Sequence, residues 1–432
     1  MGPASESPDF LTGRLAVDAT GNVYLTGYFS TEVAVGGTTL TATTRYDSYL
    51  AKYDAQGTPE WVRQGEGQET IADAIATDAS GNVCLVGRFQ AAVTFGGPPL
   101  YGAGTFFCKL SPAGTVLQAT RWGTACRPLA LALDAAGNSY VAGEFVGVAT
   151  IGSTGLTSAG RNDIFLSRLD PSGTPVWTQR DGGPLEDVAV NLALDADGAP
   201  VVCGYYDWNG GPGSKIYLAR FSPQGVPLWV RKPTGSTSFF LGAESVAYDG
   251  RGGYCIAGGF WGSVSFGSAT LVGSTVSQLY VARYDGQGNM VWAGTAAGYS
   301  QGYALAANAA GELYLTGVLG FDVTFGSLLV STGVLDCFVA RLSAGSLLTA
   351  ARPAAPGPAL AVYPNPARDA ATVVVPAGGG QLALLDALGR PVRRQTLPAG
   401  PATLPLHELP AGSYLLVLSS PTGRQVQRLT KE

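Results

Sequence analysis

The stretch that decides the fold is Asp18–Phe29, DATGNVYLTGYF, in which an Asp-x-x-Gly-Asn turn leads into an apolar strand with a glycine near its end. The pattern returns five times, and successive copies begin 60, 56, 61, 54 and 59 residues apart. The later copies begin at Asp78, Asp134, Asp195, Asp249 and Asn308. A period of this size is typical of propellers, solenoids and other repeat arrays.

Each copy has a second half that also has the pattern of strands. A strand with one basic residue, such as DSYLAKYD at 47–54, is followed by a glycine turn and a further strand. That further strand carries a tryptophan in four copies, whereas Gln118 and Thr349 stand there in the second and sixth. The segments are rich in β-branched and aromatic residues and bounded by Gly, Pro, Asp and Asn, which predicts strands. A short V-x-F-G segment, absent from the fourth copy, predicts an accessory hairpin.

Four strands in each repeat predict an all-β fold, a six-bladed β-propeller followed by a small C-terminal β-sandwich. The repeat region begins with the turn half and ends with the basic-strand half. We therefore expect the two ends to join in one mixed sheet, which closes the ring and removes open sheet edges. The alternative is an open β-solenoid, which needs capping repeats. The predicted parts are a tail (1–10), the propeller (11–349), a Pro/Ala linker (350–358) and the C-terminal sandwich (359–432).

The repeats resemble a known family. The D-x-x-G-N-x-Y-x-x-G and F-x-A-[KR]-[YL]-D segments of residues 11–349 are similar to the SBBP-type β-propeller repeats of secreted Bacteroidetes proteins. The resemblance implies the propeller architecture. It implies no catalytic residues, since the functions of that family are varied or unassigned.

The C-terminal part carries short motifs that are specific in combination. They are the Y-P-N-P opening, a turn glycine, and the L-P-A-G-x-Y entry into the central apolar strand. Their residues are Tyr363, Pro364, Asn365, Pro366, Gly389, Leu409, Pro410, Gly412 and Tyr414. Together they resemble the type A sorting domain of the type IX secretion system (T9SS). The resemblance implies T9SS machinery as a partner and a protein that is secreted or held at the outer-membrane surface. The alternative is an ordinary sandwich appendage.

The N-terminal sequence MGPASESPDF has no basic n-region and no apolar h-region, so no secretory signal is seen as written. Export needs such a signal. The sequence therefore favours a truncated or misassigned start, and the alternative is a cytosolic protein that is not exported.

Composition excludes several classes of protein. The formal net charge is −5, 46% of the residues are hydrophobic and 13% are charged, which argues against intrinsic disorder and against nucleic acid as a partner. No apolar run is long enough for a membrane helix. The single histidine, His407, excludes a Ser-His-Asp triad and most zinc sites, so we predict no catalytic triad, metal or cofactor. The six cysteines are expected to be free core thiols, with one disulfide as the alternative.

Charged residues recur at two repeat positions. The basic-strand position holds a cation in all six copies, and the turn begins with an acid in the first five. These residues are Lys52, Lys109, Arg168, Arg220, Arg283 and Arg341, with Asp18, Asp78, Asp134, Asp195 and Asp249. A residue that recurs in every repeat usually serves the repeat, so we interpret the cations as structural partners of carboxylates or carbonyls. The alternatives are a ring of charges around a channel and, at Asp195 and Asp197, a calcium loop.

The fourth repeat departs from the pattern with YYDWNGGPG at 205–213. Aromatic rings beside an acid can stack on sugars, so Tyr205, Asp207, Trp208 and the nearby Trp261 form the predicted ligand site. The alternative is that the neighbouring Tyr206 and Trp208 are core residues.

These observations predict a monomeric binding or structural protein whose ligands are glycans or surface proteins. The rival hypothesis is a secreted polysaccharide hydrolase or lyase that uses channel carboxylates. Two or three unpaired carboxylates close together would favour the enzyme, and a face of aromatic and amide groups would favour binding.

Overall fold

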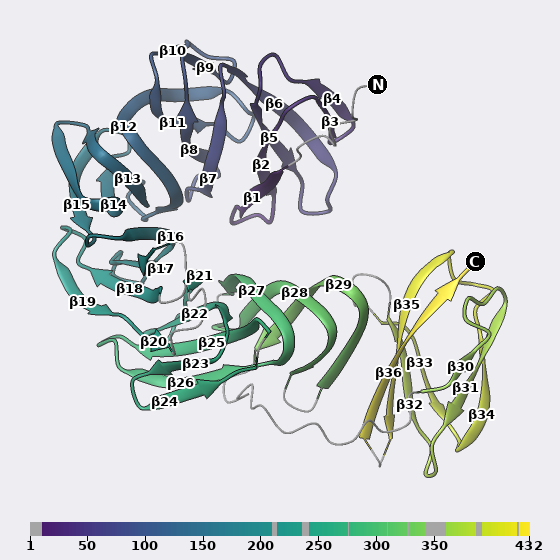
Figure 1. Cartoon of the computed structure of the whole chain (residues 1–432). Helices are drawn as coiled ribbons and strands as arrows, with labels where there is room; N and C mark the ends of the chain where they lie inside the picture. The colour runs from purple at the N-terminus through teal and green to yellow at the C-terminus, as the bar shows by residue number, and fades with distance from the viewer. Residues whose placement is uncertain are drawn as a thin grey trace, which may run out of the picture. The chain divides into compact units, whose positions relative to one another are not determined.

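The computed structural model describes residues 11–209, 214–235, 242–274, 276–308, 310–325, 328–342, 360–385, 391–420 and 423–432. Every regular element in these residues is a β-strand, which confirms the predicted all-β class (Figure 1). The chain divides into two compact units. The first, here the repeat unit, is Met1–Phe321 with Thr332–Leu348, and the second, here the C-terminal unit, is Asp322–Ser331 with Thr349–Glu432. The predicted tail (1–10) and linker (350–358) lie outside the described residues.

The first three repeats contribute fifteen strands. They are β1 (Leu11–Val17), β2 (Val23–Phe29), β3 (Glu32–Val35), β4 (Thr38–Thr41), β5 (Asp47–Tyr53), β6 (Pro59–Gly67), β7 (Ile71–Thr77), β8 (Val83–Phe89), β9 (Ala92–Thr94), β10 (Leu100–Tyr101), β11 (Gly104–Leu110), β12 (Val116–Leu133), β13 (Ser139–Ile151), β14 (Thr154–Leu169) and β15 (Pro175–Asp181). The long strand β12 ends the second repeat and begins the third.

The last three repeats follow the same order. Their strands are β16 (Glu186–Leu194), β17 (Pro200–Trp208), β18 (Lys215–Phe221), β19 (Pro227–Arg231), β20 (Thr234–Gly235), β21 (Gly242–Tyr248), β22 (Gly253–Phe260), β23 (Ser263–Phe266), β24 (Ala269–Val272), β25 (Gln278–Asp285), β26 (Met290–Thr295), β27 (Ala297–Ala307), β28 (Leu313–Phe325) and β29 (Leu328–Leu342).

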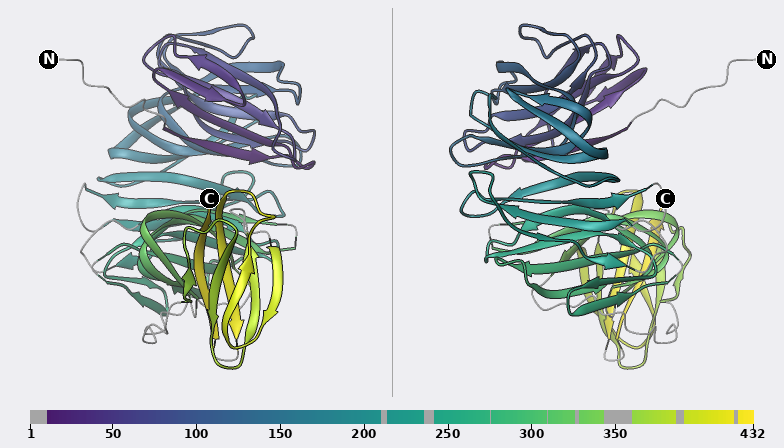
Figure 2. Two further views of the ribbon diagram at one scale, coloured as in Figure 1. Left: turned by 90° about the vertical axis from the view of Figure 1, so that its right-hand side faces the viewer. Right: turned by 60° about the vertical axis from the view of Figure 1, so that its left-hand side comes forward.

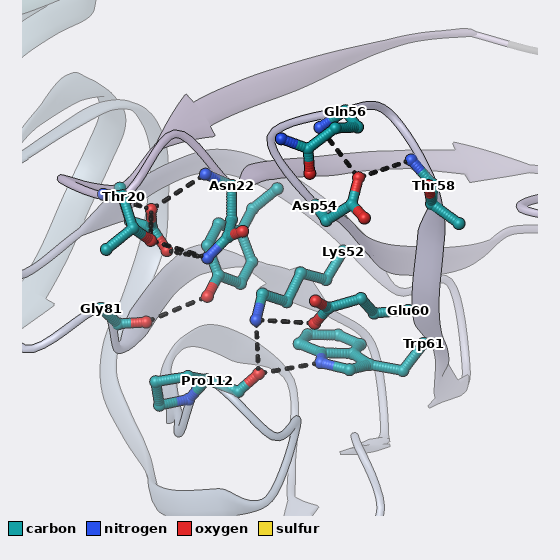
Figure 3. Close-up of polar contacts among 12 residues, drawn as sticks. Thr20, Asn22, Lys52, Asp54, Gln56, Thr58, Glu60, Trp61, Gly81 and Pro112 are labelled. Atoms are coloured by element: carbon teal, nitrogen blue, oxygen red, sulfur yellow. Dashed lines mark hydrogen bonds and ion pairs between the residues drawn. The ribbon is translucent and has the colours of Figure 1, made fainter.

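The Asp-x-x-Gly-Asn sequence forms the tight turn between the first two strands of a repeat. Asp18 Oδ1 accepts the backbone NH groups of Thr20 (2.9 Å) and Asn22 (3.0 Å), and the NH of Gly21 donates to Asp18 O (Figure 3). Gly21 has a φ of +88°, in the left-handed region that glycine adopts without strain. Because the turn satisfies its own backbone, it fixes the register of the hairpin locally.

Within a repeat the first strand, the strand after the turn, the basic strand and the strand that follows it pair in this order. In the first repeat the order is β1-β2-β5-β6, and in the fifth it is β21-β22-β25-β26. The sixth repeat gives β27-β28-β29, and β1 lies at the edge of its sheet. The expected mixed sheet made from both ends of the repeat region is therefore wrong. The physical reason is that the turn hairpin pairs with the basic strand that follows it in sequence, so the first repeat is complete by itself.

Successive repeats are joined by side-chain packing and in places by shared sheets. The strand β12 belongs to one sheet of the second and third repeats, β6 pairs with β9, and β20 pairs with β23. The first strands of neighbouring repeats contact each other, as β1 contacts β7 and β16 contacts β21. Core clusters of the described residues combine side chains of two successive repeats, such as Leu50 with Ile75 and Leu218 with Val246. Figure 2 shows these sheets from two further sides.

A hydrogen bond from a side chain to a backbone carbonyl of the following repeat accompanies this packing. The indole Nε1 of Trp61 donates to Pro112 O (3.0 Å) (Figure 3). Trp177 and Trp229 do the same to Pro223 O and Gly286 O (both 3.1 Å). In the second repeat the Gln118 amide donates to Ser172 O instead. The recurring tryptophan is thus explained by a carbonyl in the next repeat.

The accessory segments form hairpins. β3 pairs with β4, β9 with β10, and β23 with β24, whereas in the fourth repeat β17 pairs directly with β18. All six cysteines are free, and Cys84, Cys108, Cys203 and Cys255 are buried, whereas Cys126 is partly buried and Cys337 is exposed. The alternative of one disulfide is not what the structure shows.

The C-terminal unit contains two sheets around one apolar core. Its strands are β30 (Val362–Tyr363), β31 (Ala370–Val375), β32 (Gly380–Leu385), β33 (Pro391–Leu397), β34 (Gly400–Pro405), β35 (Gly412–Ser420) and β36 (Gly423–Lys431). The orders are β30-β31-β34 and β33-β32-β35-β36. Val373, Leu384, Leu416 and Leu429 are fully buried between the sheets.

The sorting motif surrounds the start of β35. The Tyr414 hydroxyl donates to Pro410 O (2.7 Å), and its ring is part of the core. Asn365 Oδ1 accepts the NH of Thr430 (2.9 Å), which ties the Y-P-N-P segment to the last strand. Leu409 packs against the same core, whereas Gly389 lies outside the described residues.

Candidate functional site

The first strand of a repeat contains a β-bulge. Its pairing register shifts in β7 between Ala72 and Ala74, and in β21 between Ala243 and Ser245. The extra residue lies five positions before the acid of the turn, and it is Asp73 in β7 and Glu244 in β21. A bulge re-aims the side chain of the extra residue. Because the other repeats have Gly, Leu, Val or Tyr there, the two carboxylates do not serve the repeat itself.

Asp73 is the centre of an ion-pair network between the second and third repeats. Its Oδ2 lies 3.1 Å from Arg88 Nε and its Oδ1 lies 3.7 Å from Arg127 Nε. Arg127 Nη1 also lies 3.4 Å from Glu144 Oε1, and Asn162 donates to Glu144 Oε2 (2.7 Å). Burial raises the pKa of Asp73, and the charges of Arg88 and Arg127 oppose this.

Two further carboxylates, Glu186 and Glu244, have no hydrogen bond or ion pair among the described residues. Both are partly buried. Burial raises the pKa of Glu186, and the charge of Glu144 raises it further. Burial also raises the pKa of Glu244, opposed by the Arg14 guanidinium. Both acids are therefore easier to protonate than free glutamate, and each has oxygen atoms open to a donor from outside the protein.

Tyr205 lies among these carboxylates. It follows Gly204 in β17, the same repeat position as Arg88 in β8 and Glu144 in β13. Burial raises the pKa of Tyr205, and the charges of Glu144, Glu186 and Glu244 raise it further. The phenol therefore stays neutral and can both donate and accept a hydrogen bond. Its ring meets Trp208 edge-on, with centroids 5.7 Å apart and planes at 77°.

We define the bulge cluster as the polar residues gathered at this end of the first two strands. Its members are Asp73, Arg88, Arg127, Glu144, Glu186, Tyr205 and Glu244. Chemically it offers carboxylate acceptors, a neutral phenol and a neighbouring indole, a set that suits a ligand rich in hydroxyl groups.

Of the predicted ligand residues, the structure brings together Tyr205 and Trp208. Asp207 has a φ of +59° and forms an ion pair with Lys215, and its NH donates to Asp187 Oδ1 (2.7 Å). Trp261 follows β22, in the next repeat, and its place in the site stays a prediction.

The alternative interpretation of the neighbouring Tyr206 as a core residue agrees with its contacts. Its ring stacks on Tyr217 (15° between planes, 6.1 Å between centroids), beside the core of the third and fourth repeats. The Lys232 ammonium lies 3.1 Å from the centroid of the same ring.

In three of the six repeats the repeated cation meets the turn acid of its own repeat. Lys109 lies 2.8 Å from Asp78, Arg220 lies 2.7 Å from Asp195, and Arg283 lies 2.6 Å from Asp249, in each case to Oδ2. The structural interpretation of the whole set stays a prediction.

The other three repeats differ. Lys52 meets Glu60 (2.8 Å) and Pro112 O (3.2 Å) (Figure 3). Arg341 meets Glu312 (3.0 Å), and Asp18 is occupied within its own turn. Arg168 Nε is buried without a hydrogen-bond partner among the described residues, and Asp134 accepts instead from Ala136 and Asn138.

The suggested calcium loop is occupied by protein donors. Asp195 Oδ1 accepts the NH groups of Asp197 and Ala199 (both 2.9 Å), and Oδ2 accepts from Arg220 and the Tyr254 hydroxyl (2.8 Å). In the described part of the chain, no group of three or more His, Cys, Asp or Glu side chains is placed to hold a metal. No helix in that part could span a membrane.

The sequence analysis missed the acids of the bulge cluster. A signal was present for Asp73 and Glu244: when the repeats are aligned on the turn acid, the position five residues earlier is charged in only two of six repeats. A charge that breaks the repeat pattern within an otherwise apolar strand is the feature that distinguishes a site residue from a scaffold residue.

Replacing Glu244 by glutamine is expected to raise the free energy of unfolding at pH 7. Because the pKa of Glu244 is raised above its usual 4.5, wild type loses stability as pH rises from 4.5 through the folded-state pKa. The gain should therefore disappear below about pH 4.5. Urea unfolding at pH 7 and pH 4 measures it. Glu312→Gln is the control: hydrogen bonds from Asn308 and Tyr314 lower the pKa of Glu312, so no gain is expected.

Comparison with known proteins identifies the C-terminal unit. Residues 361–432 match the family model described as a secretion system C-terminal sorting domain. A comparison with curated proteins gives no match.

Solved structures give only distant similarity. A Bacteroides caccae protein of unknown function is 10% identical, with a TM-score of 0.31, covering 57% of this chain and 89% of that one. PorZ of Porphyromonas gingivalis, described as a surface component of the type IX secretion system, is 12% identical, with a TM-score of 0.25 and coverage of 97% and 70%. NanB sialidase of Streptococcus pneumoniae is 8% identical, with a TM-score of 0.30 and coverage of 98% and 68%. TM-scores this low carry no argument about function.

The sorting tail, by contrast, indicates a secreted or cell-surface protein that is exported through the type IX secretion system.

Proposed function

We propose that this chain is a monomeric surface protein whose repeat unit, a six-bladed propeller of SBBP type, binds a glycan at the bulge cluster. The observation that carries the proposal is the pair Glu186 and Glu244, which have no hydrogen-bond partner among the described residues, beside the neutral phenol of Tyr205. Partly buried carboxylates without donors cost folding free energy, and sugar hydroxyl groups would supply the missing donors. The Trp208 ring adds an apolar surface of the kind that sugar rings stack on.

The test is a glycan array probed with the full chain. We expect Glu186→Gln or Trp208→Ala to weaken binding of any glycan found by roughly tenfold or more, the loss of one hydrogen bond to a charged group. Glu66→Gln, an exposed acid in β6, is the control and should bind like wild type. Equal binding by all three variants would place the glycan elsewhere and refute the assignment of the site.

A second candidate function is hydrolysis or cleavage of a polysaccharide. It is favoured by the same two carboxylates, because a glutamate with a raised pKa can act as a general acid near neutral pH. This candidate predicts that the full chain releases new sugar ends from a polymer and that Glu186→Gln and Glu244→Gln abolish the release. Binding without release favours the first proposal, whereas release without stable binding favours the enzyme.

A further inference from the structure

The first and sixth repeats each expose an apolar face that is buried in every other repeat. The position three residues before the turn acid is 3–8% exposed in repeats two to six but 65% exposed at Leu15 in the first. Its buried equivalents are Ile75, Leu131, Leu192, Val246 and Leu305. Val23 and Leu25, in the next strand of the first repeat, are also partly exposed, unlike Val83 and Leu85 at the same positions of the second (both 0%).

The sixth repeat exposes the opposite kind of face. The position two residues before the repeated cation is 0–1% exposed in the first five repeats but 76% exposed at Val339. Its buried equivalents are Leu50, Phe107, Leu166, Leu218 and Val281. Tyr314 and Thr316, on β28, are likewise partly exposed where the first repeat buries Tyr24 and Thr26 (both 0%).

These two positions share a core cluster at four of the five joints between successive repeats. Four core clusters of the described residues span two repeats, and each combines the equivalent of Val339 in one repeat with the equivalent of Leu15 in the next. The pairs are Leu50 with Ile75, Phe107 with Leu131, Leu166 with Leu192, and Leu218 with Val246. Val281 and Leu305, of the fifth and sixth repeats, are also buried, so Val339 and Leu15 are the two exposed members, one of each type.

The geometry points to a sixth joint of the same kind: we infer that the Val339 face of the sixth repeat packs on the Leu15 face of the first repeat of the same chain. This inference rests on the six-repeat ring of the proposed function and specifies how that ring closes, through side chains and without a shared sheet. Burying two matched apolar faces is favourable, and an unburied pair would be an aggregation hazard.

The occupant we favour is the same chain rather than a second copy, because the first strands of all six repeats follow one another in contact. The contacts run from β1 to β7, β12, β16, β21 and β27. The Arg14 guanidinium in β1 of the first repeat opposes the rise in the pKa of Glu244 in β21 of the fifth. Their charges therefore interact although 230 positions separate them in the sequence. When the first strands of the first and fifth repeats lie close together, the sixth repeat is the nearest one that can offer a matching apolar face to the first repeat.

This joint lacks one support that other joints have. Trp61, Trp177 and Trp229 each donate to a carbonyl of the following repeat, whereas the sixth repeat has Thr349 at that position, outside the described residues. We therefore expect the ring to open first between its sixth and first repeats.

The test is a cross-link in the full chain. Leu15→Cys and Val339→Cys are combined with Cys337→Ser, which removes the exposed native thiol nearby, and a short bifunctional maleimide is added. We expect a peptide linked through positions 15 and 339 within single chains, at several times the yield of a control pair. The control pairs Leu15→Cys with Val272→Cys, which is 74% exposed on an accessory hairpin of the fifth repeat.

Three other outcomes would overturn the inference. Links only between two chains would assign the faces to a second copy, and a yield equal to that of the control would leave the array open. A footprint of the wild-type chain by a diffusing carbene needs no variant: Leu15 and Val339 should be labelled several-fold less than Val272, and equal labelling contradicts closure. If the chain cross-links but binds no glycan, only the proposed function is refuted. If it binds a glycan but does not cross-link, only the closure of the ring is refuted.

Discussion

Replacing Arg220 by methionine is expected to lower the free energy of unfolding by about 3 kcal/mol or more, because it leaves a buried carboxylate without its cation. Arg220 Nη2 lies 2.7 Å from Asp195 Oδ2, and the Asp195 side chain is only 4% exposed. The same oxygen accepts from Tyr254 of the next repeat, so the pair connects a turn, a basic strand and a joint between repeats. Methionine keeps the apolar volume and removes only the charge and its donors.

The loss should depend on pH in a defined direction. Burial favours neutral Asp195, but the bonds from Ala199, Tyr254 and Arg220 outweigh it and lower its pKa below the usual 3.8. A lowered folded-state pKa contributes stability above pH 3.8, which is lost as pH falls through the folded-state value. The difference between wild type and Arg220→Met should therefore be full at pH 7 and shrink below about pH 3.8. Urea unfolding over this range measures it.

The matched control is Arg341→Met in the sixth repeat. Arg341 stands at the same repeat position, but its side chain is 62% exposed and that of its partner Glu312 is 39% exposed. Exposed ion pairs contribute little, so no measurable shift of the urea midpoint is expected. Equal losses at Arg220 and Arg341 would contradict the argument from burial. Asp195→Asn in the Arg220→Met chain should recover part of the loss, because it removes the unpaired charge.

The sequence predicts the local parts of this fold and misses the pairing between them. The turn at Asp18 and its five copies could be predicted because an acid, a glycine and a short loop satisfy their own backbone, and that information lies within five residues. The pairing of β2 with β5 could not, since a basic strand can pair with the hairpin before it or after it and both choices fit the same alternation. The expected mixed sheet paired the basic strand with the hairpin that follows it, whereas in the structure it pairs with the hairpin before it.

The candidate site likewise has residues that the sequence predicts and residues that it does not. Tyr205 and Trp208 could be predicted because they interrupt a repeat, and the structure places their rings in contact. Glu186 and Glu244 lie in strands 58 residues apart, and only the convergence of the first strands brings both to Tyr205. Such convergence depends on how whole repeats pack, which no local pattern encodes.

Deleting residues 359–432 is expected to abolish surface delivery while leaving the repeat unit folded. The family match places the sorting domain at 361–432, within the deleted segment. The buried residues of the clusters between repeats all precede position 359, whereas the core with Val373, Leu384 and Leu429 belongs to the C-terminal unit alone. The deletion thus removes one core completely and removes no residue from the others.

The experiment expresses the deleted chain, with an export leader, in a bacterium that has a type IX system. Nearly all of the protein should remain inside the outer membrane, with the protease resistance of the full chain's repeat unit. Arg368→Ala, at a side chain 82% exposed in the C-terminal unit, is the control and should reach the surface as wild type does. Because the two cores share no residue, a deleted chain found on the surface contradicts the role of the sorting tail. A degraded chain would instead show that the repeat unit depends on the C-terminal unit for its stability.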